Sequence, residues 1–145
     1  MKMKRALLLI LITAIFLVLA CGGRPSPRKI VMEFMEAVYD SDSEAILKYV
    51  DFEAVARGKL KHLPQEEQLQ NLDLMKKDLY SSLIKSGAVR AKWQSYRPVV
   101  ADETVQGDSA WVDVTFMHKE TGSTRFTQMI LLWKENSWKI TSYVE

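Results

Sequence analysis

The chain of 145 residues is 48% hydrophobic and 26% charged, and its 20 basic and 18 acidic residues give a formal net charge of +2. A chain of this size can bury one hydrophobic core, so a single folded domain is expected. Cys21 is the sole cysteine of the chain, which excludes an intramolecular disulfide.

The first twenty residues have the composition of a secretory signal peptide. Lys2, Lys4 and Arg5 form a basic start, and residues 6–20 carry no charge. This apolar run is shorter than the roughly 20 residues that span a bilayer, which argues against a transmembrane helix. Removal of residues 1–20 leaves 17 basic against 18 acidic residues, a balance of −1. Since no cluster of Lys and Arg with interleaved aromatic residues remains, we expect no nucleic-acid partner.

The four residues "VLAC" that end at Cys21 resemble a bacterial lipobox, with an aliphatic residue three positions before the cysteine and a small residue directly before it. The resemblance implies cleavage before Cys21, a thioether-linked diacylglycerol on its sulfur and often another acyl chain on its amine. Two or three chains anchor a protein stably, because each buried methylene adds about 0.8 kcal/mol. We therefore expect an exported lipoprotein, and an uncleaved membrane anchor with an incidental cysteine is the alternative. Gly22 in place of an aspartate favours the outer membrane, facing the periplasm, if the host has two membranes.

Residues 21–27, which include "GGRPSP", lack periodicity and are expected to form a short tether ahead of a domain over residues 28–145. Fully extended at about 3.4 Å per residue, GGRPSP reaches roughly 20 Å, which keeps the domain close to the lipid headgroups. A helix is predicted with Ser26 as its cap and Pro27 at its first position. Its apolar residues recur at fours: Ile30, Phe34 and Val38.

Further helical segments follow in the first half of the chain. Ser41 and Glu44 have the spacing of a capping box ahead of the next apolar stripe, and Asp51 is expected to open another short helix. The longest segment, Gln65 to Ser86, places four leucines on one face: Leu69, Leu72, Leu79 and Leu83.

The second half of the chain changes to the two-residue period of β-strands. Val89 to Val100 is rich in β-forming residues, and Ala110 to Phe116 alternates cleanly between apolar and other side chains. Thr124 to Lys134 is apolar at both parities, and the last strand is predicted from Trp138 to Val144. The connections have the length and content of hairpin turns. Helices followed by a four-stranded antiparallel meander predict an α+β fold with the helices on one face of the sheet.

This order of elements, together with "FMEAVYDSDSEAILKYV" and the closing "MILLWKENSWKITSYVE", resembles the nuclear transport factor 2-like (cystatin-like) superfamily. The resemblance implies a cone-shaped domain in which N-terminal helices pack on a curved sheet, often with an apolar pocket at the open end. Five residues are expected in the core or along that pocket: Phe34, Val38, Trp93, Phe116 and Trp138. A narrower resemblance of "VDFEAVARGKL" and "LYSSLIKSG" to toluene-tolerance-type periplasmic phospholipid-binding proteins implies a lipid-filled cavity instead.

Few side chains indicate chemistry. His62 lies in a predicted loop, His118 lies at a strand end and Cys21 is expected to be acylated, so we expect no metal and no cofactor. Enzymes of the resembled superfamily, such as ketosteroid isomerases and scytalone dehydratases, use Asp, His and Tyr inside the cone. The residues of these types to inspect are Asp40, Asp113, Tyr39 and Tyr96. Asp113 alternates with expected core residues and Asp40 is expected to end a helix, so catalysis ranks below binding.

A second apolar set lies on the other parity of the predicted strands: Trp111, Met129, Leu131 and Trp133. Apolar residues at both parities indicate that both sheet faces are covered there, by the chain's own loops, a second copy or a partner protein. Members of the resembled superfamily often dimerise through this outer face. The sequence therefore predicts a non-catalytic envelope module, anchored by acyl chains on Cys21, that binds a small apolar ligand, a lipid or a protein. A phospholipid-binding protein is the alternative, and an isomerase- or dehydratase-like enzyme comes third.

Overall fold

The computed structural model of the protein describes residues 23–143, so the predicted signal peptide, Cys21 and Val144 lie outside the described residues. Within this part of the chain, five helices precede four strands. The helices are α2 (Pro27–Asp40), α3 (Ser43–Tyr49), α4 (Phe52–Leu60), α5 (Gln65–Leu83) and α6 (Ala88–Gln94). The strands are β1 (Tyr96–Gln106), β2 (Ser109–His118), β3 (Thr124–Lys134) and β4 (Ser137–Ser142). None of these helices is long and apolar enough to cross a bilayer.

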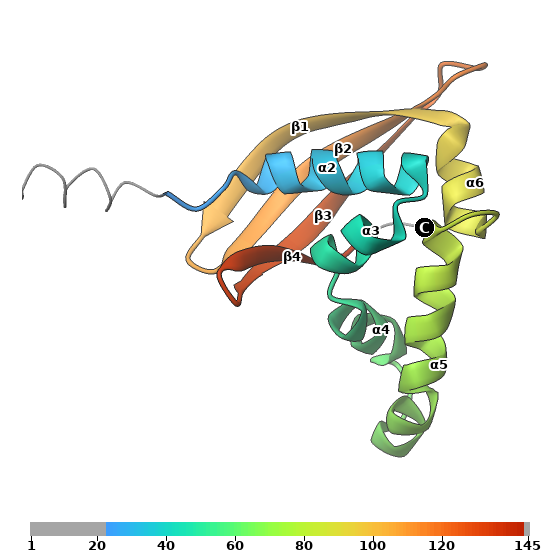
Figure 1. Ribbon diagram of the computed structural model, residues 1–145, viewed down its shortest axis with the longest axis vertical. Helices are drawn as coiled ribbons and strands as arrows, with labels where there is room; N and C mark the ends of the chain where they lie inside the picture. Colours follow the sequence, from blue (N-terminus) through green and yellow to red (C-terminus); the bar gives the residue numbers. More distant parts are fainter. Residues whose placement is uncertain (1–22, 144–145) are drawn as a thin grey trace, which may run out of the picture.

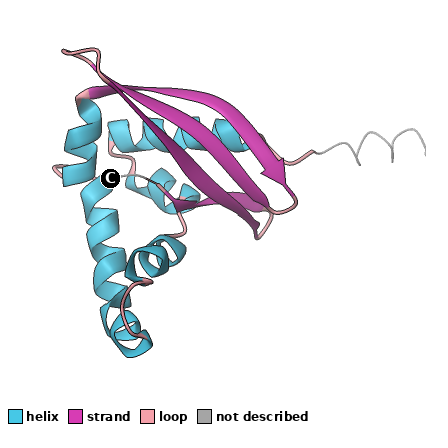
Figure 2. Cartoon of the chain, turned by 180° about the vertical axis from the view of Figure 1, so that it is seen from behind, coloured by secondary structure: helices cyan, strands magenta, loops and turns pink. Residues whose placement is uncertain are grey.

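The four strands form one antiparallel sheet in the order β1-β2-β3-β4, a simple meander. Helix α2 lies along one face of this sheet, α3 follows it, and α6 leads into β1 at one end (Figure 1). Seen from behind, the opposite face of the sheet carries no described helix (Figure 2). The arrangement confirms the predicted α+β class, with helices on one face of a four-stranded antiparallel sheet.

Helix α2 supplies the central part of the helical layer. Ser26 caps it as predicted, because the Ser26 side chain accepts a hydrogen bond from the backbone N–H of Lys29, and Pro27 occupies the first turn. Phe34 and Val38 of its inner face are fully buried against the sheet. The apolar side of α2 that the sequence pattern predicts therefore faces the core.

The predicted cap of the second helix is wrong. Asp42, one residue after the expected Ser41, caps α3 by accepting a hydrogen bond from the backbone N–H of Ala45 at 3.0 Å. Ser41 instead ends α2 in the left-handed conformation, and its hydroxyl accepts from the Lys85 amide at 2.9 Å. An acidic side chain caps as well as a hydroxyl does, so the two adjacent candidates could not be separated by residue type alone.

The predicted strand over Val89 to Val100 is also wrong in its first half. Ala88–Gln94 forms α6, and β1 begins at Tyr96. Val89 and Trp93 stand four residues apart on one helical face, and both are buried. In so short a segment, apolar residues can fit both the two-residue period of a strand and the spacing of a helix.

The face assignment of β3 needs a further correction. Antiparallel pairing sets Met129 opposite Val112 and Leu131 opposite Ala110, on the inner face of the sheet. Met129 and Leu131 are fully buried beneath the helices, so their predicted place on an outer interface is wrong. Ile130 is half-buried and faces outward beside its pairing partner Trp111. Because β3 is apolar at both parities, its own sequence could not show which set faced the core.

An aromatic cluster fills the interior between α2, α6 and the sheet. Phe34 and Trp93 lie edge to face with ring centroids 5.9 Å apart, and Trp93 and Phe116 lie 5.3 Å apart. Tyr143 closes the cluster at 5.9 Å from Phe34 and 6.1 Å from Trp93. All four side chains are buried. Such pairs add specific geometry to the burial of large apolar surfaces, so this part of the interior is a packed core.

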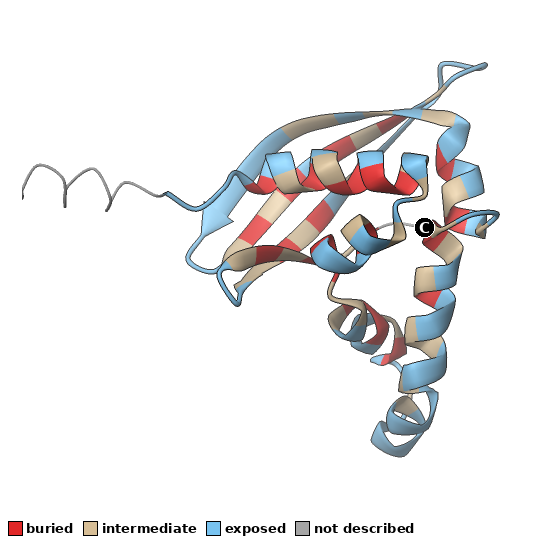
Figure 3. Ribbon diagram, viewed as in Figure 1, coloured by how far each residue is buried: buried red, intermediate tan, exposed pale blue. Residues whose placement is uncertain are grey.

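Helices α4 and α5 form a hairpin that projects beyond the sheet (Figure 1). The 19-residue α5 buries two of its residues, Leu79 and Leu83, both toward its C-terminal end. Leu69 in its outer half and Leu74 at its middle are 61% and 60% exposed, and Figure 3 shows the outer part of the hairpin mostly in the colour of exposed residues. Of the predicted leucine face, Leu79 and Leu83 are buried, Leu72 is partly buried against the core, and Leu69 is exposed.

Part of the segment expected to be a short tether contacts the domain. Trp138 donates a hydrogen bond from Nε1 to the Pro25 carbonyl at 2.8 Å, and the Ser26 hydroxyl contacts Glu103 at 2.7 Å. Arg24 pairs with Asp108 at 2.8 Å. These contacts bring Arg24, Pro25 and Ser26 of the expected tether onto the domain.

Candidate binding site

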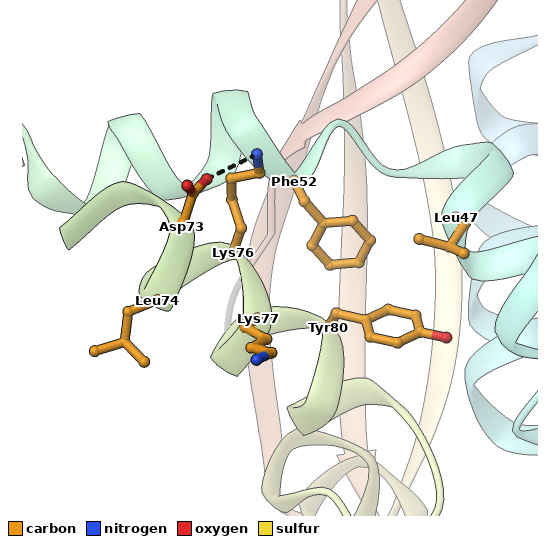
Figure 4. A pocket seen from close by; sticks show the side chains of 7 residues that line it. All are labelled: Leu47, Phe52, Asp73, Leu74, Lys76, Lys77 and Tyr80. Atoms are coloured by element: carbon orange, nitrogen blue, oxygen red, sulfur yellow. Dashed lines mark hydrogen bonds and ion pairs between the residues drawn. The ribbon is translucent and has the colours of Figure 1, made fainter. Parts of the chain in front are cut away.

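An apolar groove of about 640 Å³ lies between α3, the start of α4 and the middle of α5. Its lining residues are Leu47, Phe52, Asp73, Leu74, Lys76, Lys77 and Tyr80 (Figure 4). Leu47 comes from α3, Phe52 is the first residue of α4, and the others come from α5. Three helices that are separate in the sequence therefore contribute to one surface.

Two aromatic side chains form the centre of the groove. Phe52 and Tyr80 lie edge to face, with ring centroids 5.7 Å apart and planes at 89°. Both are partly buried and pack against the core, so their positions are fixed by the fold. Figure 4 shows Leu47 facing this pair across the groove. Side chains held in this way present apolar surface without having to rearrange.

Leucines at the sides of the groove are exposed to an unusual degree. Leu47 is 54% exposed and Leu74 is 60% exposed, whereas Leu60, Leu79, Leu83 and Leu131 are buried. Removing apolar surface from water contributes about 25 cal/mol per Å², so a ligand or partner that covers these residues gains free energy. Leu47 and Leu74 therefore offer apolar surface beside the Phe52–Tyr80 pair that a ligand or partner can cover.

Charged side chains line one edge of the groove. Asp73 and Lys76 form an ion pair at 3.3 Å on consecutive turns of α5, and Asp73 is 94% exposed, so the pair adds little stability. Lys77 has no ion-pair partner among residues 23–143. At this edge of the groove, the ammonium group of Lys77 therefore lies beside the apolar side chains of the lining.

Smaller hollows lie elsewhere on the described surface. One of about 360 Å³ lies between α2 and β1, with Met32, Tyr39 and Val100 among its lining residues. Another, of about 250 Å³, lies at the end of the sheet near α6 and includes Phe126, which is 81% exposed. These hollows do not reach the size of the groove on α5.

The five residues predicted to line a pocket are all buried. Phe34, Val38 and Trp138 are buried in the closed core. Trp93 and Phe116 belong to the same core and also form the inner wall of the 250 Å³ hollow. Their role in ligand binding stays a prediction. The residues of the groove on α5 escaped sequence reasoning because their neighbourhood depends on how the helices fold back on one another.

The residue types considered for catalysis do not converge. Asp113 lies exposed on the outer sheet face, where it accepts a hydrogen bond from Gln128 at 2.8 Å. Asp40 is exposed at the end of α2. The Tyr39 hydroxyl lies within hydrogen-bond distance of two backbone carbonyls, those of Trp93 at 2.7 Å and Tyr96 at 2.9 Å. Burial raises the pKa of Tyr39, which keeps its hydroxyl protonated as a donor.

The two histidines occupy structural positions. His118 at the end of β2 packs edge to face on Tyr96, with ring centroids 5.0 Å apart. Its Nδ1 accepts from the backbone amides of Glu120 and Thr121 in the following turn, at 3.4 and 3.3 Å. His62 lies in the connection between α4 and α5. Within residues 23–143, no three His, Cys, Asp or Glu side chains come together in a way that could hold a metal ion.

The outer sheet face carries a different apolar set from the one predicted. Trp111 lies there as expected, beside the half-buried Ile130. Trp133 is half-buried at the edge of the core, with its ring 5.3 Å from that of Trp138. The sequence alone could not assign the faces of β3, because they depend on its register with β2. The pairing of Trp111 with Ile130 determines which β3 residues lie on the same sheet face as Trp111.

Comparison with known proteins gives one structural likeness. No family model matches the chain, and no curated protein matches it. A crystal structure from Campylobacter jejuni, of an NTF2-like protein described as a candidate transpeptidase, aligns with a TM-score of 0.47 and 16% sequence identity. The alignment covers 80% of this chain and 97% of that chain. A likeness at this level carries no information on activity, so the functional assignment depends on the chain's own residues.

Proposed function

We propose that this chain is a lipid-anchored lipoprotein of the cell envelope whose α+β domain is a non-catalytic binding module. Its binding surface is the apolar groove between α3, α4 and α5. The observation that supports this assignment is the exposed apolar lining of that groove, with Leu47 and Leu74 more than half exposed around the Phe52–Tyr80 pair. The basic start, apolar run and "VLAC" segment of the sequence support export and acylation of Cys21.

The occupant of the groove is an apolar segment of a protein partner. The groove is formed on a projecting helical hairpin, where a partner chain has free access (Figure 1). Lys77 at its edge suits a carboxylate next to the apolar segment. The nuclear transport factor 2-like architecture, which we propose on the basis of the sequence resemblance, provides the scaffold that holds the hairpin.

Lipid handling, the alternative, finds less support. A protein that shields an acyl chain from water encloses it, whereas the interior between α2, α6 and the sheet is packed with Phe34, Trp93, Phe116 and Tyr143. The 250 Å³ hollow reaches Trp93 and Phe116 from the surface, but Phe34 and Tyr143 are not among its lining residues. An enzyme of the isomerase or dehydratase type would need converging Asp, His and Tyr side chains. His118 packs on Tyr96, but Asp113 lies on the outer sheet face, hydrogen-bonded to Gln128.

The test compares two leucines of α5 with almost equal exposure. A photo-crosslinking amino acid at Leu74, which lines the groove, should capture a specific envelope protein in cells that make the full chain. The same amino acid at Leu69, which is 61% exposed but does not line the groove, should not capture that protein. Equal capture at both positions would contradict the groove as the binding surface, and a co-purified phospholipid in native mass spectrometry would favour lipid handling.

A further inference from the structure

The first described residues are held on one end of the sheet by Arg24. Its guanidinium donates a hydrogen bond to the Gly107 carbonyl at 2.9 Å and forms an ion pair with Asp108 at 2.8 Å, both in the β1–β2 turn. The same guanidinium lies over the ring of Trp133 near the end of β3, 4.7 Å from its centroid. Arg24 thus contacts the β1–β2 turn and the end of β3.

The next two residues add independent contacts. The Pro25 carbonyl accepts a hydrogen bond from Trp138, a side chain that is itself fully buried. Glu103 accepts from the Ser26 hydroxyl at 2.7 Å and from the Arg28 amide at 2.6 Å, which also favours the N-terminus of α2. We call Arg24–Ser26 the clamp segment. Because its three consecutive residues have separate partners, the clamp segment is fixed in one orientation on the sheet.

The distance from the clamp segment to the proposed anchor is short. Cys21 precedes Arg24 by three residues, which span about 10 Å at most at 3.4 Å per residue. An acylated cysteine places its backbone at the level of the lipid headgroups. Whatever part of the domain surrounds Arg24 must then lie next to the lipid surface.

We propose that the clamp segment holds the turn end of the sheet, formed by Gly107–Asp108 and Glu135–Asn136, against the lipid surface. The groove on α5 then opens away from the membrane, since α5 lies at the other end of the domain from the turns (Figure 1). This inference rests on the proposed acylation of Cys21. It adds that the domain is oriented by its own contacts, so that a partner reaches the groove from the aqueous side.

The charges of the turn end indicate that lipid electrostatics do not set this orientation. Arg24 and Lys134 are matched by Asp108 and Asp51, their ion-pair partners at 2.8 and 2.7 Å, and Glu135 adds another negative charge. A basic surface that would attract anionic lipids is therefore lacking at this end among the described residues. The clamp segment and the short reach from Cys21 are what orient the domain.

The experiment uses the full acylated chain reconstituted into phosphatidylcholine vesicles. Gln106→Cys places a label beside the β1–β2 turn, and Gln70→Cys places one on the outer half of α5; both glutamines are exposed. The native cysteine is acylated and does not react with the label. Each protein carries a thiol-linked fluorophore, and the quencher is a nitroxide attached to the lipid headgroup.

The expected result is strong quenching of the Gln106→Cys label and almost none of the Gln70→Cys label, unchanged when phosphatidylglycerol is added. Arg24→Ala, combined with each label, should make the quenching of the two positions converge. Equal quenching of the two labels without that substitution would overturn the proposed orientation. Failure of the acylated protein to float with the vesicles, or equal flotation of Cys21→Ser, would instead overturn the lipid anchor itself.

Discussion

Replacing Leu131 by alanine tests the inner face of β3 and with it the packing that positions the helices. Leu131 is fully buried and pairs with Ala110 on one side and Ile140 on the other, both also fully buried. The surrounding sheet and helices cannot collapse freely into the space, so the cavity persists and the cost is about 3 kcal/mol. That is a large part of the 5–15 kcal/mol by which domains are typically stable.

The neighbouring residue provides the matched control. Ile130 is half-buried on the outer face, so Ile130→Ala loses only part of a side chain's burial and costs about 1 kcal/mol. Urea titrations of both variants, followed by far-UV circular dichroism, give the two free energies of unfolding by linear extrapolation. An equal or larger loss for Ile130→Ala would refute the inner placement of Leu131 and the register between β2 and β3.

Three further outcomes are expected. Gly87→Ala should destabilise the domain by about 1–3 kcal/mol, because a Cβ there would overlap backbone oxygens of the last turn of α5. Gly58→Ala in α4 places its Cβ in open space and should stabilise the domain by about 0.5–1 kcal/mol. Thermal unfolding of the two variants measures the difference. Burial alone would raise the pKa of Asp51, but hydrogen bonds to it, led by that from Lys134, lower the pKa below its ordinary 3.8. The folded state therefore gains stability above that value and loses it as the pH falls through the lower folded pKa, so Asp51→Asn should flatten the acid limb of a stability-against-pH curve. Tyr39→Phe should cost about 1 kcal/mol in urea titration, since it removes the donor to two backbone carbonyls, and an unchanged midpoint would count against that role.

Local signals in the sequence were sufficient where a single element determines its own geometry. Ser26 and Pro27 marked the start of α2 correctly, because capping depends on residues that lie within one turn of each other. The alternation over Ala110 to Phe116 gave the inner face of β2 correctly, since polar residues on the other parity identified the outer face. The fold class followed from the order of such segments.

Structural features that depend on contacts between distant segments could not be predicted from the sequence. β3 is apolar at both parities, so only its register with β2 shows that Met129 and Leu131 face the helices. Ala88–Gln94 is too short for its period to be decided, and the contacts of Val89 and Trp93 with the core settle it as a helix. The clamp segment is a similar case, because its partners lie some eighty residues or more away in the chain.

The groove on α5 shows the same limit for function. Leu47, Phe52 and Tyr80 come together only when three helices fold back on one another, and no motif of the sequence marks them as a set. Leu74 reads as one more leucine of an amphipathic helix, and its exposure becomes apparent only once the hairpin is seen to project from the sheet.

The intact mass of the full-length protein, extracted from the membranes of a bacterial host, tests the central claim most directly. A lipid-anchored module should have the mass of residues 21–145 plus a diacylglycerol, with or without a further acyl chain, and Cys21→Ser should abolish the modification. A chain that keeps residues 1–20, or one that is cleaved but carries no lipid, would contradict the account and remove the basis for the proposed orientation.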